Sequence, residues 1–383
     1  MIDTESEVHL DQERQKQAKI YARIERRLMV AELVLGGFYA LAWLVFGWSA
    51  GFKLTLVQLV TNEWLLVAAY VAVFGGIYFL IDLPLSFYGG YILPHRFGQS
   101  NQTLKGWVGD QLKGILLGAV LGGILLEVIY LVLRTYPDTW WLWAAVILLV
   151  FNVLMANLAP VLLFPLFYKF VPLGEEHEDL VQRLKHLAEG AGTRVQGVYQ
   201  FDMSRRTKSA NAALTGLGKT RRIILGDTLL EEFSKDEIET VLAHELGHQV
   251  HKDIPLGIVV ESLTTLLGFF LAGLGLKWGA AYFGFSSSAD IAAFPVFLLA
   301  MGAYGLVTMP LGNAFSRWRE RRADLYALQV THKPKAFAAA LTRLANQNLA
   351  DVDPEAWEEW LLYSHPPLSK RITMAENYQP SEN

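Results

Sequence analysis

Residues 235–253, KDEIETVLAHELGHQVHKD, contain the pattern from which the organisation of this chain can be worked out. The stretch has helical periodicity, and His244 and His248 lie four residues apart within it. Side chains at that spacing share one helix face, one turn apart, so both imidazoles can reach the same cation. Glu245 flanks that position and can take a proton from a metal-bound water. The HELGH sequence therefore predicts a zinc site with a general base beside it.

A third ligand is required, because a catalytic zinc takes three protein ligands and leaves one position open for water. His251 lies two helical turns from His244, about 10 Å along the axis, which is too far for one metal ion, and we interpret it as a surface residue. Glu320, in NAFSRWRERRADLYAL (313–328), is the better candidate. Asp324, one turn later, can accept a hydrogen bond from a ligand imidazole. Spacing alone supports equally well a charged cluster that only anchors the end of a membrane helix.

Composition assigns the chain to the membrane proteins. Of its 383 residues, 52% are hydrophobic and 18% are charged, and the mean hydropathy is +0.27, which is too apolar for an ordinary soluble enzyme. The net charge of -4 excludes a nucleic-acid-binding function, since neutralising phosphates requires a basic surface. The chain has no Cys, so any metal must be held by His and carboxylates.

Six stretches are long and apolar enough to cross a bilayer, which takes about 20 residues. They are residues 29–50, 64–86, 113–133, 139–169, 255–277 and 292–315. Each must be helical, because lipid offers backbone polar groups no partner. Pro160 and Pro165 are expected to break the fourth span near one end. Asp82, an acid inside the second span, is typical either of a functional site or of a polar contact between helices.

The distribution of Lys and Arg predicts that both ends of the chain are cytoplasmic. Basic residues concentrate before the first span and between the second and third, at Arg23, Arg26, Arg27, Arg96, Lys105 and Lys113, whereas the opposite loops hold little besides Lys53, Arg134 and Lys277. We therefore divide the chain into a cytoplasmic amphipathic segment (1–28), four transmembrane helices (29–170), a cytoplasmic part with the HELGH helix (171–254), two further transmembrane helices (255–315) and a cytoplasmic C-terminal part with Glu320 (316–383).

The polar part between the fourth and fifth spans has the pattern of a small mixed domain. Residues 175–190 form an amphipathic helix that Gly190 ends. Strand-like runs follow at 194–202, 209–215 and 221–226, and 235–251 returns to helical periodicity. The predicted fold is a mainly α integral membrane protein, with about six transmembrane helices and a cytoplasmic zincin-like α+β domain that has a small sheet.

Three segments together resemble one known family. HELGH (244–248), SRWRERRADLYA (316–327) and ILPHRFGQSNQTLKGW (92–107) are similar to the type I CAAX prenyl endopeptidases, membrane zinc proteases that cleave prenylated C-terminal tails. The resemblance runs from about residue 33 to 376 and includes APVLLFPLFYKFVPL (159–173). It implies a metalloendopeptidase of the lipid bilayer with one Zn²⁺ per chain, whose partner is a peptide or protein substrate such as a prenylated tail.

The resemblance also implies roles for the residues of the metal site. His244, His248 and Glu320 would bind the zinc. Glu245 would act as the general base, and Asp324 would support a ligand from behind.

Further roles follow for substrate binding and catalysis. Asn211 and Ala212, in SANAALTG (209–216), would lie on an edge strand that pairs with the substrate backbone. Such pairing uses main-chain hydrogen bonds and does not depend on the substrate's side chains. His365, in YSHPPLSKRI (363–372), would stabilise the oxyanion, with Arg371 assisting.

Two other functions stay open. A membrane quality-control protease with the same metal chemistry would cut misfolded membrane proteins, although such relatives usually have fewer spans and PHRFGQSNQT favours the prenyl-protease branch. A transporter or receptor with a structural zinc would need no base beside the metal, so Glu245→Gln would leave it working. The eukaryotic members of the family have an additional span before the first one here, so six helices would have to close the chamber that the family is described as enclosing.

Overall fold

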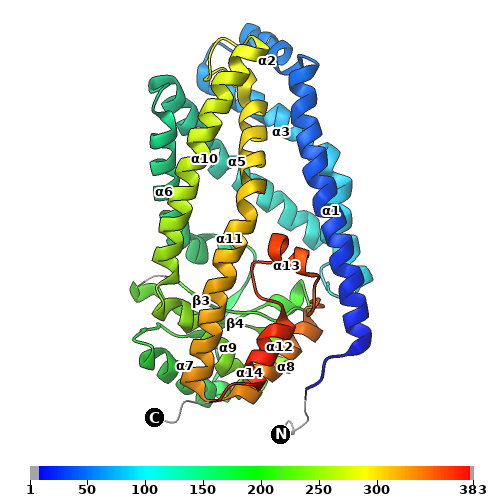
Figure 1. The fold of residues 1–383 in the computed structure, drawn as a ribbon, viewed down its shortest axis with the longest axis vertical. Helices are drawn as coiled ribbons and strands as arrows, with labels where there is room; N and C mark the ends of the chain where they lie inside the picture. Colours follow the sequence, from blue (N-terminus) through cyan, green and yellow to red (C-terminus); the bar gives the residue numbers. More distant parts are fainter. Residues whose placement is uncertain (1–7, 217, 380–383) are drawn as a thin grey trace.

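The computed structural model describes residues 8–216 and 218–379. Long helices run along an elongated molecule, and a small sheet with shorter helices lies toward one end, which α1 (Gln12–Val45) and α11 (Phe294–Thr331) also reach (Figure 1). The start of α1 and all of α14 (Leu368–Glu376) lie at the same end as the sheet. Residues 1–7 of the predicted N-terminal segment and 380–383 of the predicted C-terminal part lie outside the described residues.

Six helical stretches in the described part of the chain have the length and hydropathy of membrane spans. They are Gln12–Val45, Glu63–Arg96, Leu104–Thr135, Trp140–Leu166, Asp253–Phe283 and Ile291–Thr331. Many of their apolar side chains are not covered by protein: Val307 is 75% exposed and Leu116 is 66% exposed. Contiguous apolar surface of this kind is stable when lipid covers it. The chain is therefore a multi-pass membrane protein, and the predicted class, mainly α with about six spans and a small sheet, is confirmed.

Several spans continue into other helices. The first is one unbroken helix from Gln12 onward, and the second runs from α3 (Glu63–Phe87) through a π-helical turn (Tyr88–Ile92) into α4 (Leu93–Arg96). As expected, the fourth loses α-helical geometry at Pro160, which has no backbone N–H to donate. The remaining long helices are α5 (Leu104–Thr135), α6 (Trp140–Leu158), α10 (Asp253–Phe283) and α11 (Phe294–Thr331), and α2 (Trp48–Leu59) is a short helix that sequence reasoning missed.

The sheet has four strands in the order β1-β2-β4-β3. Its strands are β1 (Phe170–Pro172), β2 (Val198–Phe201), β3 (Ala212–Thr215) and β4 (Arg222–Gly226). β2 and β4 are parallel, whereas β1 and β3 are each antiparallel to their neighbours. β3 is therefore an edge strand, which leaves one side of its backbone free for pairing. β1 was not predicted, because three residues are too few to show alternation.

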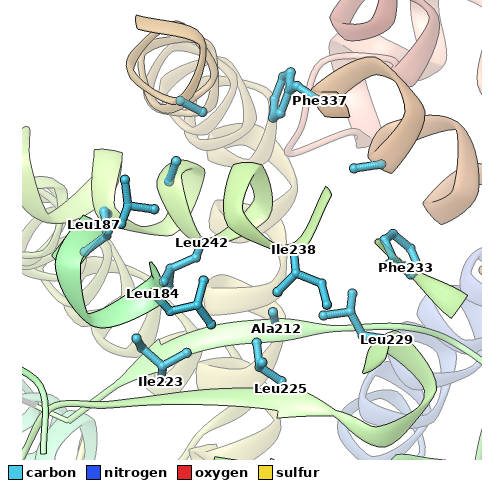
Figure 2. Close-up of a cluster of buried hydrophobic side chains, with 14 of the residues drawn as sticks. Leu184, Leu187, Ala212, Ile223, Leu225, Leu229, Phe233, Ile238, Leu242 and Phe337 are labelled. Atoms are coloured by element: carbon cyan, nitrogen blue, oxygen red, sulfur yellow. The ribbon is translucent and has the colours of Figure 1, made fainter. Parts of the chain in front are cut away.

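Shorter helices and the sheet bury a common core. The helices are α7 (Glu178–Gly190), α8 (Asp227–Glu232), α9 (Lys235–Val250) and α12 (Pro334–Gln347), together with α14. α13 (Ala356–Leu362) instead packs on α11. Figure 2 shows Ile238 and Leu242 of α9 packed over Ile223 and Leu225 of β4. These four side chains are at most 2% exposed, and each contributes about 1.5–3 kcal/mol by its burial. The core thus fixes α9 against the sheet.

Candidate metal centre

α9 carries the HELGH sequence as a regular helix. Its first turn is closed by a capping box, in which Ser234 accepts from the backbone of Glu237 and the Glu237 side chain accepts from the backbone of Ser234. The helix places His244 and His248 one turn apart, with ring centroids 4.9 Å from each other. The predicted shared face is therefore present.

α11 supplies the carboxylate. A Cβ atom on Gly247 would lie 2.8 Å from the Cα atom of Ala323, so only glycine allows the two helices to pack this closely. The contact brings Glu320 to the imidazoles: its Oε2 lies 3.2 Å from His244 Nε2, and its Oε1 lies 3.5 Å from His248 Nε2. One ligand atom from each of the three side chains falls within 4.8 Å of the others.

The three side chains fit a divalent cation. Glu320 is 7% exposed, and the partners of its two oxygens among the described residues are imidazole nitrogens. Burial of a carboxylate is costly unless a positive charge faces it. Two imidazole nitrogens and one carboxylate are a donor set that zinc accepts, and they leave a coordination position open.

His244 is oriented by a buried ion pair behind its ring. Its Nδ1 lies 2.7 Å from Asp324 Oδ1, and Asp324 is fully buried. Arg371 of α14 donates to both oxygens of Asp324, at 2.8 and 2.6 Å. Burial lowers the pKa of His244, but the hydrogen bond to Asp324 and the nearby Glu320 outweigh it and raise the pKa to about 9. Arg371 thus lies behind the ligand ring, on the side away from Glu320.

His248 is oriented by a residue that sequence reasoning missed. Its Nδ1 lies 2.8 Å from Oδ2 of Asp253, which is 2% exposed and is the first residue of α10. Lys252, between the two helices, adopts a left-handed conformation with φ of 56° and turns the chain. The available signal was an acid shortly after the end of the metal-binding helix. His251 instead contacts the carbonyl oxygen of Gly247 and is not part of the metal cluster.

The remaining candidates lie around this cluster. Glu245 is half-buried; burial raises the pKa of its carboxyl group, while His244 and His248 oppose the rise. His365, between α13 and α14, has its Nε2 3.4 Å from Glu320 Oε1 and a side chain that is 57% exposed. Asn211 is exposed just before edge strand β3, on which α9 packs.

Comparisons with known proteins agree with this geometry. Residues 175–379 match peptidase family M48, and residues 3–169 match the CAAX prenyl protease N-terminal family, described as five membrane helices. Four candidate spans begin within that second range in the described part of the chain.

Individual relatives cover most of the chain. An uncharacterized metalloprotease, YhfN, of Bacillus subtilis is 29% identical over 94% of this chain and 84% of its own length. CAAX prenyl protease 1 of Saccharomyces cerevisiae is 32% identical over 77% of this chain and 68% of its own. The crystal structure of S. mikatae Ste24p superposes with a TM-score of 0.86 at 25% identity, over 96% of this chain and 90% of that one. The chain belongs to peptidase family M48 and, within it, to the CAAX prenyl endopeptidases, which are membrane metalloendopeptidases.

Proposed function

We propose that this protein is a zinc endopeptidase of the CAAX prenyl protease type. His244, His248 and Glu320 would hold the zinc, and Glu245 would be the general base. The observation that carries the proposal is the buried Glu320 carboxylate, whose two oxygens lie 3.2 and 3.5 Å from the Nε2 atoms of His244 and His248, so that all three side chains can reach one ion.

The side chains around the metal divide the work of hydrolysis. When bound, zinc would supply Lewis-acid polarisation of the scissile carbonyl and of the attacking water. Glu245 takes a proton from that water and passes it to the leaving amine. His365 donates a hydrogen bond to the carbonyl oxygen as negative charge develops there, and Arg371 assists by holding Asp324 and thereby His244.

The substrate is a peptide in extended form, and its natural source is a prenylated C-terminal tail. Edge strand β3 supports the first part, because it ends the sheet and packs against α9, so that a peptide could pair with it at Asn211 and Ala212. The second part is supported by the relatives that carry the name CAAX prenyl protease. A cytoplasmic position for this site and for both ends of the chain is supported by the excess of basic residues on one side of the spans.

Cleavage of a matched peptide pair tests the proposal. The protein, purified in detergent, is incubated with one peptide in prenylated and unprenylated forms, with and without a chelator. We expect chelator-sensitive cleavage that zinc restores and that favours the prenylated form. Glu245→Gln should keep the metal and lose activity about 10²- to 10⁴-fold.

The other outcomes identify the alternatives. Equal cleavage of both peptides would indicate a quality-control protease. Full function of Glu245→Gln with bound metal would contradict an endopeptidase and indicate a structural zinc.

A further inference from the structure

Side chains of α11 hold the end of α13. Arg317 Nη1 donates to the carbonyl oxygens of Glu359 and Tyr363, at 2.8 and 2.6 Å, and Asn313 Nδ2 donates to that of Leu361 at 2.7 Å. The last carbonyl groups of a helix have no partner within the helix. A cation at that end also complements the helix dipole. The two α11 side chains therefore act as the C-terminal cap of α13.

These contacts come from the same face of α11 that builds the metal centre. Asn313, Arg317, Glu320 and Asp324 are spaced by four, three and four residues, which places them in one stripe along the helix. Along this stripe, Arg317 binds the end of α13, Glu320 faces the imidazoles, and Asp324 binds Arg371 of α14. One helix face thus sets the position of α13 relative to the metal ligands.

The segment that this cap holds carries His365. Tyr363, whose carbonyl Arg317 binds, lies two residues before His365, and the next side-chain anchor to α11 is Arg371, six residues after it. The side chain of His365 is 57% exposed, and the polar contacts of its ring with the residues that the structure describes are to the Ser364 hydroxyl at 3.0 Å and to Glu320 at 3.4 Å. The ring is therefore held in place by the backbone on either side of it.

The hydrogen bonds to the end of α13 are the main polar contacts of Arg317 among the described residues. It makes no ion pair with any residue that the structure describes, although other arginines of α11 lie near the carboxylate of Asp253 or stack on aromatic rings. A simple juxtamembrane anchor would need only a positive charge. Arg317 instead directs Nη1 to two carbonyl groups at the end of α13, which requires the side chain to be held in one position.

We propose that Arg317, with Asn313, is a positioning residue for His365. It caps the end of α13 and so fixes where the loop presents the imidazole beside Glu320. The inference rests on the proposed function, in which His365 stabilises the oxyanion. A misplacement of about 1 Å in such a group can cost up to about 100-fold in rate.

A double-mutant comparison tests this role. Arg317→Ala, His365→Ala and the double variant are assayed for kcat, KM and bound metal, with Arg317→Lys as the conservative variant. We expect Arg317→Ala to lower kcat about 10- to 100-fold with KM and metal content within about twofold. Arg317→Lys should recover part of the loss, and the double variant should be no slower than His365→Ala.

Arg321 provides the matched control. It is exposed, lies on the same helix, and no hydrogen bond or ion pair to it is seen among the described residues. Arg321→Ala removes the same charge and should leave kcat within about twofold. An equal loss from Arg317→Ala with and without His365 would overturn the proposal, as would loss of the metal.

Hydrogen exchange separates this inference from the proposed function. If the wild-type protein showed no metal-dependent cleavage, the proposed function would fail, and exchange at residues 361–365 would still report on the cap. We expect faster exchange in Arg317→Ala than in Arg321→Ala. Identical exchange in the two variants would show that Arg317 does not position this loop.

Discussion

The two imidazoles of the HELGH helix are oriented by carboxylates of different origin. His244 depends on Asp324, which lies 80 residues later on another helix and is itself held by Arg371. His248 depends on Asp253, only five residues later. The side chain of His244 is 11% exposed and that of His248 is 22% exposed. One half of the candidate metal centre is thus built by tertiary contacts among α9, α11 and α14, and the other half is built by residues that are close in sequence.

The largest expected effect comes from breaking the tertiary half with Asp324→Ala. His244 loses its acceptor and Arg371 remains buried without a partner. We expect metal affinity to fall about 10- to 100-fold and the free energy of unfolding to fall by about 3–5 kcal/mol. Zinc titration and denaturant unfolding in detergent measure the two quantities. Asp324→Asn, which keeps the shape and one acceptor, should lie between this variant and the wild type; unchanged affinity in Asp324→Ala would contradict the assigned role.

A smaller effect is expected from the local half, through Asp253→Ala. His248 loses its acceptor, but the nearest cation, Arg322, is 3.8 Å away and partly exposed, so no buried charge loses its partner. We expect metal affinity to fall about 10-fold, with much less loss of stability than in Asp324→Ala. The same two titrations check this. Equal destabilisation by both variants would show that the two halves do not differ.

The smallest expected difference between the two histidines is in how zinc affinity and stability depend on pH. In the metal-free protein the pKa of His244 is raised from 6.5 to about 9, so below that pH the ring carries a proton that zinc must displace. Zinc affinity should therefore rise about tenfold per pH unit between pH 7 and 8.5. The raised pKa also stabilises the metal-free protein below pH 6.5, and this contribution is lost as the pH rises through about 9. Asp324→Ala should flatten both dependences, whereas Asp253→Ala should keep that of His244.

The difference between local and tertiary contacts also explains which parts of the site could be predicted from the sequence. His244, Glu245 and His248 follow from spacing on one helix, and the six spans follow from the demands of lipid, so both were accessible without coordinates. Glu320 was ambiguous until α11 was seen packing on Gly247, because a spacing of 72 residues from His248 carries no geometric information. Asp253 was missed because its role depends on the left-handed turn at Lys252.

Elements with few residues, and contacts made only to the backbone, also could not be predicted from the sequence. β1 has three residues, and the cap that Arg317 forms on α13 acts through carbonyl groups, which no side-chain pattern reveals. In the sequence Arg317 looked like one more basic residue at the end of a membrane helix. Only the packing of α13 against α11 distinguishes it from its neighbours.

The metal content of Glu320→Ala shows whether α9 and α11 together hold one ion. Wild-type protein and the variant are dialysed against the same limiting zinc buffer in detergent, and metal per chain is measured by elemental analysis, with circular dichroism to show that both are folded. We expect one zinc per chain in the wild type and loss of the ion from the folded variant. A folded Glu320→Ala protein that keeps one tightly bound zinc would contradict this expectation.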